Sequence, residues 1–337
     1  MAKVNLKELA QVLNVSISTV SKALRGSYEI GETTKQRIVA KAEELGYTPN
    51  PYAGFLRNHK SKNIALIVPE LNNNFFIQAI SGAESVTRSK DYHLLVYCTH
   101  DDAEQEKKII HHLQNGRVDG VIMSLSSNTT DYSHLNELQL SGIPIVFFDR
   151  IAYEIETAKI TTDDFVSAFN ATEHLILNGC KKIAYLSVSK SLSIDLKRKQ
   201  GYLEALNKYN LPAKNEWIIQ CNNEEKNNLK KIKQLLQSTH KPDAIFASVE
   251  QLALNTYYVC KELAINIPKQ LKLICFSNLQ TAPLLNPSLT TIQQPAFNMG
   301  EQAALILFKH LDKKRTSIPN EHVILKSTLV VRDSTKK

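Results

Sequence analysis

Four polar side chains recur along one short segment at the spacing of a single helix face. Ser18, Ser21, Lys22 and Arg25 follow the pattern i, i+3, i+4, i+7, so a helix would present their hydroxyl and cationic groups together. Such groups hydrogen-bond to base edges and phosphates, and lysine and arginine neutralise the phosphate backbone of nucleic acids. The pattern therefore predicts a DNA-binding face, with a merely solvated helix surface as the alternative.

Two short helices and a tight turn are needed to hold this face in place. The first helix is predicted to begin after Asn5, an N-cap residue with Glu8 three positions on, and to end at Asn14. A second helix at about residues 16–24 carries the polar face, and a third helix ends at Gly46. Apolar residues recur at helical spacing in the first and third helices: Leu6, Leu9, Ala10, Leu13, Ile38, Ala42 and Leu45. This is the pattern of a helix-turn-helix with a support helix, although a three-helix cap that packs on another part of the chain has the same periodicity.

The charge distribution also favours a nucleic-acid partner. The net charge is +8, and residues 1–62 hold ten Lys and Arg against five Asp and Glu. A basic end of this kind suits a phosphate backbone, although a solvated basic segment has the same composition. The five cysteines lack C-x-x-C spacing, which argues against a zinc site or a disulfide framework and fits a reducing compartment. No apolar run is long enough for a membrane span or a signal peptide, so we expect a cytoplasmic protein without membrane contact.

Beyond residue 62 the apolar pattern alternates between short strands and amphipathic helices. In the first half, strands are predicted at 64–68, 93–98, 120–124 and 143–149, with helices at 75–89, 103–115 and 132–141. After Thr161 the pattern restarts, with helices at 163–178, 197–209, 224–238 and 250–264 and strands at 182–188, 216–220, 243–248 and 271–276. Repeated βα units predict doubly wound parallel sheets, and the doubling predicts two similar lobes. Ligands bind such sheets at the carboxyl ends of the strands.

Several stretches are similar to those of the LacI family of bacterial transcription regulators, namely VSISTVSKALRG, GYTPNPYAGFLR, NIALIVPELNNNFF, LTTIQQPAFNMGEQA and LVVRDS. The resemblance covers nearly the whole chain. It implies an N-terminal all-α helix-turn-helix domain and an α/β two-lobed core like that of periplasmic binding proteins, with two doubly wound parallel sheets. The implied boundaries are 1–48 for the helix-turn-helix, 49–61 for a hinge, 62–161 and 291–317 for one lobe, and 162–290 and 318–333 for the other. A helix at 297–311 would return to the first lobe, and the last strands, 322–331, would close the second.

The resemblance implies sequence-specific binding to double-stranded operator DNA. Ser18, Lys22 and Ile17 are expected to face base edges. Phosphates are expected at Ser16, Thr19, Ser21, Arg25 and Tyr47, and Asn5, Asn50 and Ala53 complete the expected contacts. In the family the hinge becomes helical only on operator DNA; Leu56 stands at its minor-groove wedge, and Gly54 stands where arginine is usual. One helix-turn-helix reads few bases, so we expect a homodimer on a near-palindromic site.

The resemblance also implies a small-molecule effector, a sugar or sugar derivative, bound between the lobes. The residues at the family's ligand positions are Phe75, Phe76, Asp149, Arg198, Glu250, Ser277 and Asn278. Ordinary core packing is the alternative for the two phenylalanines, and a surface position is the alternative for the arginine. Val249 and Glu250 stand where the family usually has Asn-Asp, and Ser277 and Asn278 replace an Asp-Asp pair. Loss of these acids beside Arg198 favours an anionic ligand, such as a uronate or sugar phosphate.

Signatures of catalysis are missing from the sequence. No G-x-G-x-x-G follows the first core strand, and neither G-x-x-x-x-G-K-[ST] nor G-x-S-x-G occurs. The His100-Asp101-Asp102 and His111-His112 segments lack metal-ligand spacing, so solvated helix starts are expected there. We therefore predict no catalytic residue, no metal and no cofactor. Two other functions stay open, a periplasmic-type solute-binding protein without regulatory DNA binding and an enzyme on the same scaffold. The basic helix-turn-helix favours a regulator, and we expect a repressor.

Overall fold

The computed structural model describes residues 4–47, 60–114, 116–222, 224–312 and 318–336. The chain separates into two compact units, residues 1–61 and residues 62–337, and each is described by itself. Of the described helices, none is both long enough and apolar enough to cross a membrane.

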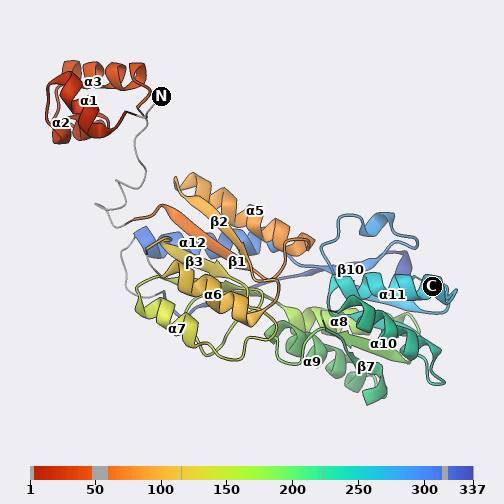
Figure 1. The fold of residues 1–337 in the computed structure, drawn as a ribbon. Coiled ribbons are helices and arrows are strands. Elements are labelled where there is room, and N and C mark those ends of the chain that lie inside the picture. The colour runs from red at the N-terminus through yellow and green to blue at the C-terminus, as the bar shows by residue number, and fades with distance from the viewer. Residues whose placement is uncertain (1–3, 48–59, 115, 223, 313–317, 337) are drawn as a thin grey trace. The chain divides into compact units, whose positions relative to one another are not determined.

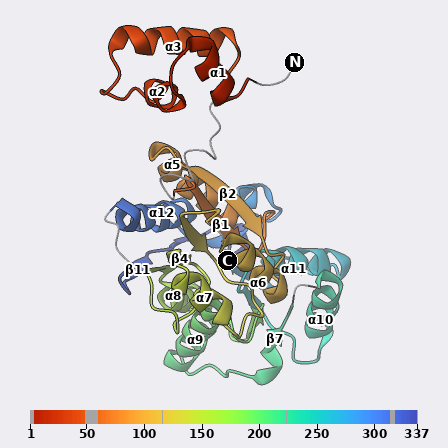
Figure 2. The ribbon, with the colours of Figure 1, turned by 60° about the vertical axis from the view of Figure 1, so that its left-hand side comes forward.

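The N-terminal unit is a bundle of three helices, α1 (Leu6–Leu13), α2 (Ile17–Ala23) and α3 (Glu32–Glu44) (Figure 2). The predicted cap of α1 is confirmed, because Asn5 Oδ1 accepts the backbone N–H groups of Lys7 and Glu8 at 3.0 Å and Glu8 accepts that of Asn5 at 3.0 Å. Asn14 then adopts the left-handed conformation, with φ 51°, and ends the helix. Leu9, Val20 and Ile38, one from each helix, are fully buried in the small core. This packing fixes α2 while leaving its polar face outward.

The first lobe is built on a parallel sheet with the strand order β11-β5-β4-β3-β1-β2. Its strands are β1 (Asn63–Val68), β2 (His93–Cys98), β3 (Gly120–Met123), β4 (Ile145–Phe148), β5 (Lys159–Thr162) and β11 (His322–Leu325). One face packs on α5 (Asn74–Ser89) and α12 (Ala296–Asp312), and the other on α6 (Ala103–Leu113) and α7 (Ser133–Leu140) (Figure 1). The alternation is visible within β1, whose Leu66 faces the first pair and Ile67 the second.

The second lobe repeats this design with the strand order β12-β10-β9-β8-β6-β7. Its strands are β6 (Ile183–Ser187), β7 (Ile218–Gln220), β8 (Ala244–Ala247), β9 (Lys272–Phe276), β10 (Thr290–Gln293) and β12 (Thr328–Val330), of which β12 pairs antiparallel. Helices α8 (Asp164–Leu177) and α9 (Ser193–Lys208) lie side by side on one face (Figures 1 and 2). Helices α10 (Glu225–Gln237) and α11 (Glu250–Glu262) cover the other. The predicted two-lobed α/β fold is thus confirmed.

The path of the last strands corrects one expectation. The boundary at residue 318 is wrong, because β11 pairs with β5 and extends the first sheet, while only β12 joins the second. Val323 and Leu325 of β11 pack against the apolar core of the first lobe, which holds the strand there. The chain therefore crosses at residues 326–327. Strands β5 and β10 were not predicted as strands, and α9 begins at Ser193, earlier than the expected 197.

Two glycines bring α5 and α12 into direct backbone contact. A Cβ added at Gly82 would lie 2.0 Å from the carbonyl oxygen of Phe297, and one at Gly300 would lie 1.9 Å from that of Ala79. No side chain fits at either position without separating the helices. This close approach fixes α5, the helix that carries Phe75 and Phe76 to the end of the sheet.

Candidate DNA-binding face and ligand cleft

The outward face of α2 presents the side chains expected at DNA. Ser16, Ile17 and Ser18 are exposed at its start, and Ser16 caps the helix by accepting the backbone N–H of Thr19 at 3.0 Å. Its hydroxyl also lies 2.7 Å from that of Ser18 and 2.8 Å from that of Thr19. These hydroxyl groups hydrogen-bond to one another, and each can donate instead to a phosphate oxygen. Asn5 differs from the rest, because its side chain is occupied in capping α1.

Lys22 in α2 and Arg25, which follows the end of α2, are both held by partners within the unit. Arg25 donates from Nε to the carbonyl oxygen of Ser21 at 2.7 Å and from Nη2 to its hydroxyl at 2.8 Å. Lys22 forms an ion pair with Glu29, from the segment between α2 and α3. Both members of that pair are about half exposed, so the bond is open to exchange with a nucleic acid. The sequence reasoning missed Glu29, whose contact depends on how this segment folds back.

The remaining expected DNA contacts lie at or beyond the end of α3. Tyr47 is partly buried against the core of the N-terminal unit, and this burial raises the pKa of its hydroxyl. Asn50, Ala53 and Leu56, together with Gly54, lie outside the described residues.

A cleft between the lobes gathers all the residues expected to bind the effector. A cavity of about 40 Å³ is lined by Phe75, Phe76, Asp149, Arg198, Glu250, Ser277 and Asn278. Asn73, Arg150, Ile194, Val249, Phe276 and Gln294 complete its lining. Most of them stand at the carboxyl ends of strands or at the starts of the helices that follow, where a doubly wound fold places ligands. Sequence reasoning missed the polar residues Asn73, Arg150 and Gln294 at this site.

Asp149 and the two phenylalanines come from the first lobe. Asp149 directly follows β4 in the left-handed conformation, with φ 59°, and is 4% exposed. Burial raises the pKa of its carboxyl group, and the guanidinium groups of Arg198 and Arg150 act in the opposite direction. Phe75 and Phe76 belong to the apolar core, as the alternative of core packing expects, and they also line the cleft. The ring of Phe76 packs edge-on against that of Phe148 at 6.3 Å.

Arg198 is buried, which excludes the surface position considered above. It is 2% exposed, and its Nε donates to Asp164 Oδ1 at 2.7 Å while Nη1 donates to the Ser248 carbonyl oxygen at 2.7 Å. Its guanidinium carbon lies 3.8 Å from the ring centre of Phe276. Burial raises the pKa of Asp164 to about 6, against the lowering effect of Arg198. Asp164, which the sequence prediction did not include, offsets the charge of Arg198. An unpaired positive charge at Arg198 was the reason to expect an anionic ligand, and that reason no longer applies.

Arg150 is held by a second buried carboxylate. Its Nη1 donates to Asp101 Oδ1 at 2.7 Å, and Asp101 also accepts the backbone N–H and the hydroxyl of Ser127 at 2.7 Å. The expectation of a solvated helix start at Asp101 is wrong, because the residue is buried as this partner. Asp102 caps α6 and His100 is exposed, as expected of a helix start. The part of the chain that the structure describes holds no cluster of three or more His, Cys, Asp or Glu suited to a metal ion.

Side chains of the two lobes hydrogen-bond to each other across the cleft. Asn278 donates to Gln78 Oε1 of α5 at 3.0 Å and to the Gln294 carbonyl oxygen at 2.8 Å. Glu250 accepts from Asn74 of α5 at 3.5 Å and from the Ser277 hydroxyl at 2.6 Å. These contacts leave room for only a few water molecules, whereas pockets for small ligands usually measure about 300–1,000 Å³. The protein's own polar groups occupy this part of the cleft.

Two family models match the chain. The model of bacterial regulatory proteins of the lacI family matches residues 5–50. The model of periplasmic binding proteins and the sugar binding domain of the LacI family matches residues 61–327. The matches meet close to the boundary between the two compact units.

Similar proteins extend over the same length. Catabolite control protein A of Priestia megaterium is 28% identical over 334 residues, covering 99% of each chain. The ribose operon repressor of Haemophilus influenzae is 27% identical over 332 residues, covering 98% of each. The solved lac repressor dimer bound to operator and the anti-inducer ONPF has the same fold, with a TM-score of 0.84 at 20% identity and full coverage of both chains. A complex of the regulator CelR with cellobiose has a TM-score of 0.73 at 22% identity, covering 98% of this chain and 100% of that one. The chain therefore belongs to the LacI family of bacterial regulatory proteins and is a DNA-binding transcription regulator.

Proposed function

We propose that this regulator is a repressor that binds a near-palindromic operator as a homodimer, in the cytoplasm, where the bacterial chromosome lies. The observation that carries the proposal is the outward hydroxyl and cationic face of α2 and its flanking residues, from Ser16 to Arg25, on a chain that also holds a two-lobed ligand core. Relatives with matching length include an operon repressor, and a solved structure of the same fold is a dimer on its operator. The family consists of regulators rather than enzymes.

We further propose that residues 49–61 act as a hinge which becomes ordered on the operator, with Leu56 as its minor-groove wedge and Asn50 and Ala53 at the DNA. This assignment rests on the resemblance of the segment GYTPNPYAGFLR to the family. An apolar side chain inserted between base pairs bends the duplex, and the bent DNA contacts a larger surface of the protein.

The effector we propose is a sugar or sugar derivative that binds between the lobes and changes operator affinity. The matching family model includes a sugar binding domain, and a regulator of the same fold forms a complex with cellobiose. The cleft offers carboxylate acceptors in Asp149 and Glu250, an amide in Asn278 and the ring of Phe75. Hydroxyl groups can pair with the polar groups, and the ring can pack against the apolar face of a pyranose.

A first prediction concerns base recognition by Lys22. Changing Lys22 to alanine should weaken binding to the preferred operator by about 1–3 kcal/mol and relax the preference at one base position. Changing Glu29 to glutamine should tighten binding, because it releases the Lys22 ammonium group from its ion pair. Selection from a randomised DNA pool, followed by fluorescence anisotropy on the selected sites, measures both effects.

Lys41→Ala on α3 is the matched control for the Lys22 experiment, because it removes the same charge from the support helix. It should leave the base preference unchanged. If Lys22→Ala lowers affinity for all sites equally and leaves the base preference unchanged, then Lys22 contacts phosphates alone.

A second prediction concerns assembly. The full chain should sediment as a dimer at micromolar concentration, and one dimer should bind one operator with two half-sites, since each helix-turn-helix reads only a few bases. Analytical ultracentrifugation with and without the selected operator tests this. A monomer that binds a single half-site with full affinity would contradict the homodimer.

A third prediction concerns the contacts that close the cleft. Changing Asn278 to aspartate replaces the donor to Gln78 by a second acceptor and places a further carboxylate near Glu250. The lobes should separate, which raises the radius of gyration measured by small-angle X-ray scattering. Operator affinity should change by about 1–3 kcal/mol, the usual size of coupling between two sites.

The control for the cleft is Asn136→Asp, which makes the same chemical change on exposed α7. Adding Gln78→Lys to Asn278→Asp restores an attraction across the cleft and should restore the compact form. An unchanged scattering profile for Asn278→Asp would show that the cross-lobe amide contact does not hold the lobes closed.

A further inference from the structure

The second sheet ends in a short strand with one open side. Strand β7 pairs with β6 and forms the edge of the sheet. Cys221, just beyond the strand, donates its N–H to the Ser187 carbonyl oxygen of β6 at 2.8 Å. Since backbone groups alternate in direction along a strand, those of Ile219 and Cys221 point toward β6. The intervening residues Ile218 and Gln220 therefore turn backbone groups to the open side. An exposed strand edge can pair with an extended segment of another protein.

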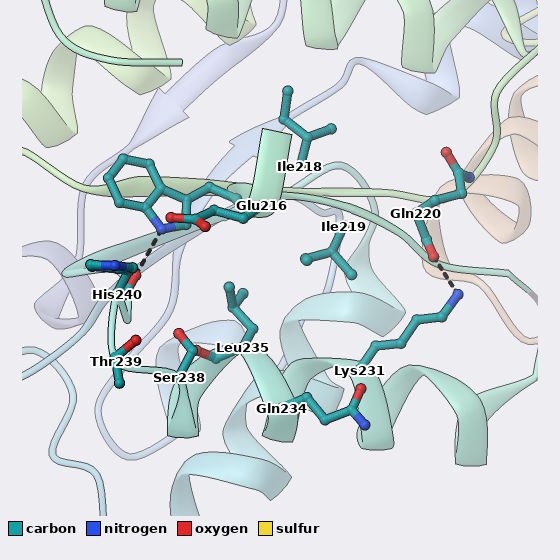
Figure 3. Close-up of a pocket in the computed structure, with 11 residues that line it drawn as sticks. Glu216, Ile218, Ile219, Gln220, Lys231, Gln234, Leu235, Ser238, Thr239 and His240 are labelled. Atoms are coloured by element: carbon teal, nitrogen blue, oxygen red, sulfur yellow. Dashed lines mark hydrogen bonds between the residues drawn. The ribbon is translucent and has the colours of Figure 1, made fainter. Parts of the chain in front are cut away.

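A cavity of about 440 Å³ lies on the α10 side of this edge. Figure 3 shows its lining, with Ile219 and Leu235 facing one another between the strand and the helix. The buried indole of Trp217 completes the apolar floor and donates to the His240 carbonyl oxygen at 2.8 Å. The other lining residues are Glu216, Ile218, Gln220, Lys231, Gln234, Ser238 and Thr239. The cavity is thus apolar below and polar at its rim.

A second cavity of about 380 Å³ lies on the α9 side of the same strand. It shares Ile218 and Gln220 with the first, and its charged lining residues are Lys190, Lys199 and Asp195. No ion pair involves either lysine within the described residues. Asp195 is buried, and its carboxylate accepts from Tyr185, Ser187, Val188 and Ser189 at 2.5–2.9 Å. The accessible charge on this side is therefore positive.

Lys231 closes the open edge in the absence of a partner. Its ammonium group donates to the outward Gln220 carbonyl oxygen at 2.6 Å, as the dashed line in Figure 3 shows. Lysine at a strand edge prevents unwanted pairing. At the other end of the cavity, Glu216 pairs with Lys214 at 3.5 Å, so its charge is offset. A partner strand that donates an N–H to the Gln220 carbonyl oxygen displaces the Lys231 ammonium group, which can then pair with a carboxylate of the partner.

We propose that β7 binds an extended segment of a partner protein in which apolar and acidic residues alternate. Side chains of an added strand point alternately to the two faces of the sheet. Apolar side chains enter the cavity over Trp217 and Leu235, and acidic side chains meet Lys190 and Lys199 on the opposite face. This surface is separate from the DNA-binding face and the effector cleft, so the proposal goes beyond the function given above.

The probe is a fluorescein-labelled heptapeptide that alternates glutamate with valine, acetylated and amidated at its ends. Its binding to the full chain is measured by fluorescence anisotropy at low salt. We expect affinity at least about tenfold higher than for the same peptide with lysine in place of glutamate. A third peptide, N-methylated at the residues that face β7, lacks the donors for strand pairing and should bind at least about tenfold more weakly.

Variants of the chain locate the site. Gln220→Pro removes an outward N–H that β6 does not use, and an edge strand tolerates proline there. The variant should bind the glutamate peptide at least about tenfold more weakly than the wild type. The double variant Lys190→Glu/Lys199→Glu should do the same, whereas Lys269→Glu, an exposed lysine outside both cavities, should have no effect. Operator affinity should be unchanged in all of them.

The proposal is overturned if the glutamate and lysine peptides bind alike, or if neither binds. It is also overturned if the lysine double variant retains wild-type affinity, which decides the matter even where Gln220→Pro lowers the melting temperature. If sedimentation shows that Gln220→Pro reduces self-association, the edge serves a second copy of this chain, and the partner proposed here is wrong.

Discussion

Arg198→Ala should destabilise the two-lobed core by about 3–5 kcal/mol, the largest single effect we expect from a change in the cleft. The guanidinium group is buried with two hydrogen bonds and a ring contact, to Asp164, Ser248 and Phe276. Removing it leaves the buried Asp164 carboxylate, which is 5% exposed, without its charged partner. Urea unfolding of the full chain at neutral pH, followed by circular dichroism of the core, measures the loss.

A double-mutant cycle separates the ion pair from the other contacts of Arg198. Asp164→Asn in the Arg198→Ala background removes the stranded carboxylate and should recover part of the loss, so the two changes will be strongly non-additive. Arg198→Lys keeps the charge but loses the planar contact with Phe276, and should fall between wild type and Arg198→Ala. A loss of less than about 1 kcal/mol for Arg198→Ala would show that the pair contributes no more than a surface salt bridge.

This role changes how ligand experiments at Arg198 must be designed. Loss of ligand binding in Arg198→Ala would have two causes, a missing contact and a destabilised cleft. Glu250 is a better reporter, because its side chain is only partly buried at the start of α11.

Local signals in the sequence predicted the elements and the general location of the site. The two ends of α1 could be predicted because Asn5, Glu8 and Asn14 lie within ten consecutive residues. Short apolar runs and helical patterns placed most strands and helices, since each depends on neighbours a few residues apart. The cleft residues were predicted from the resemblance to the LacI family, and the doubly wound fold agrees with that prediction because its strands bring their carboxyl ends to one edge of the sheet.

The ion pairs of the cleft could not be predicted from local patterns in the sequence. Arg198 and Asp164 are 34 residues apart, and Arg150 and Asp101 are 49 apart. Neither separation in sequence corresponds to the repeat of a helix or a strand. These partners are brought together only by the packing of α8 against α9 and of one strand end against another. The amide contact between Gln78 and Asn278 spans 200 residues and both lobes. The crossing of β11 was missed for the same reason, because a four-residue strand fits either sheet until its neighbours are known.

The stability of the core should depend on pH through the same aspartate. Burial raises the folded-state pKa of Asp164 from 3.8 to about 6. Between these two values the folded chain keeps a proton on Asp164 that the unfolded chain has lost, so the free energy of unfolding falls as pH rises. The stabilisation is fully present below the unfolded pKa and is lost as pH passes the folded pKa. At about 1.36 kcal/mol per pKa unit, the loss from about pH 4 to about pH 7 amounts to about 2 kcal/mol.

The expected test compares unfolding free energies of wild type and Asp164→Asn across this pH range, because other carboxyl groups titrate in both proteins and cancel in the difference. The difference should change by about 2 kcal/mol, most of it between about pH 4 and the folded pKa of about 6. In Arg198→Ala the change should extend to higher pH, since Arg198 lowers the pKa of Asp164 in the native chain. The cost of that substitution should therefore be smaller at about pH 4, where Asp164 is protonated, than at about pH 7. A flat difference curve would show that Asp164 stays ionised throughout and that Arg198 outweighs its burial.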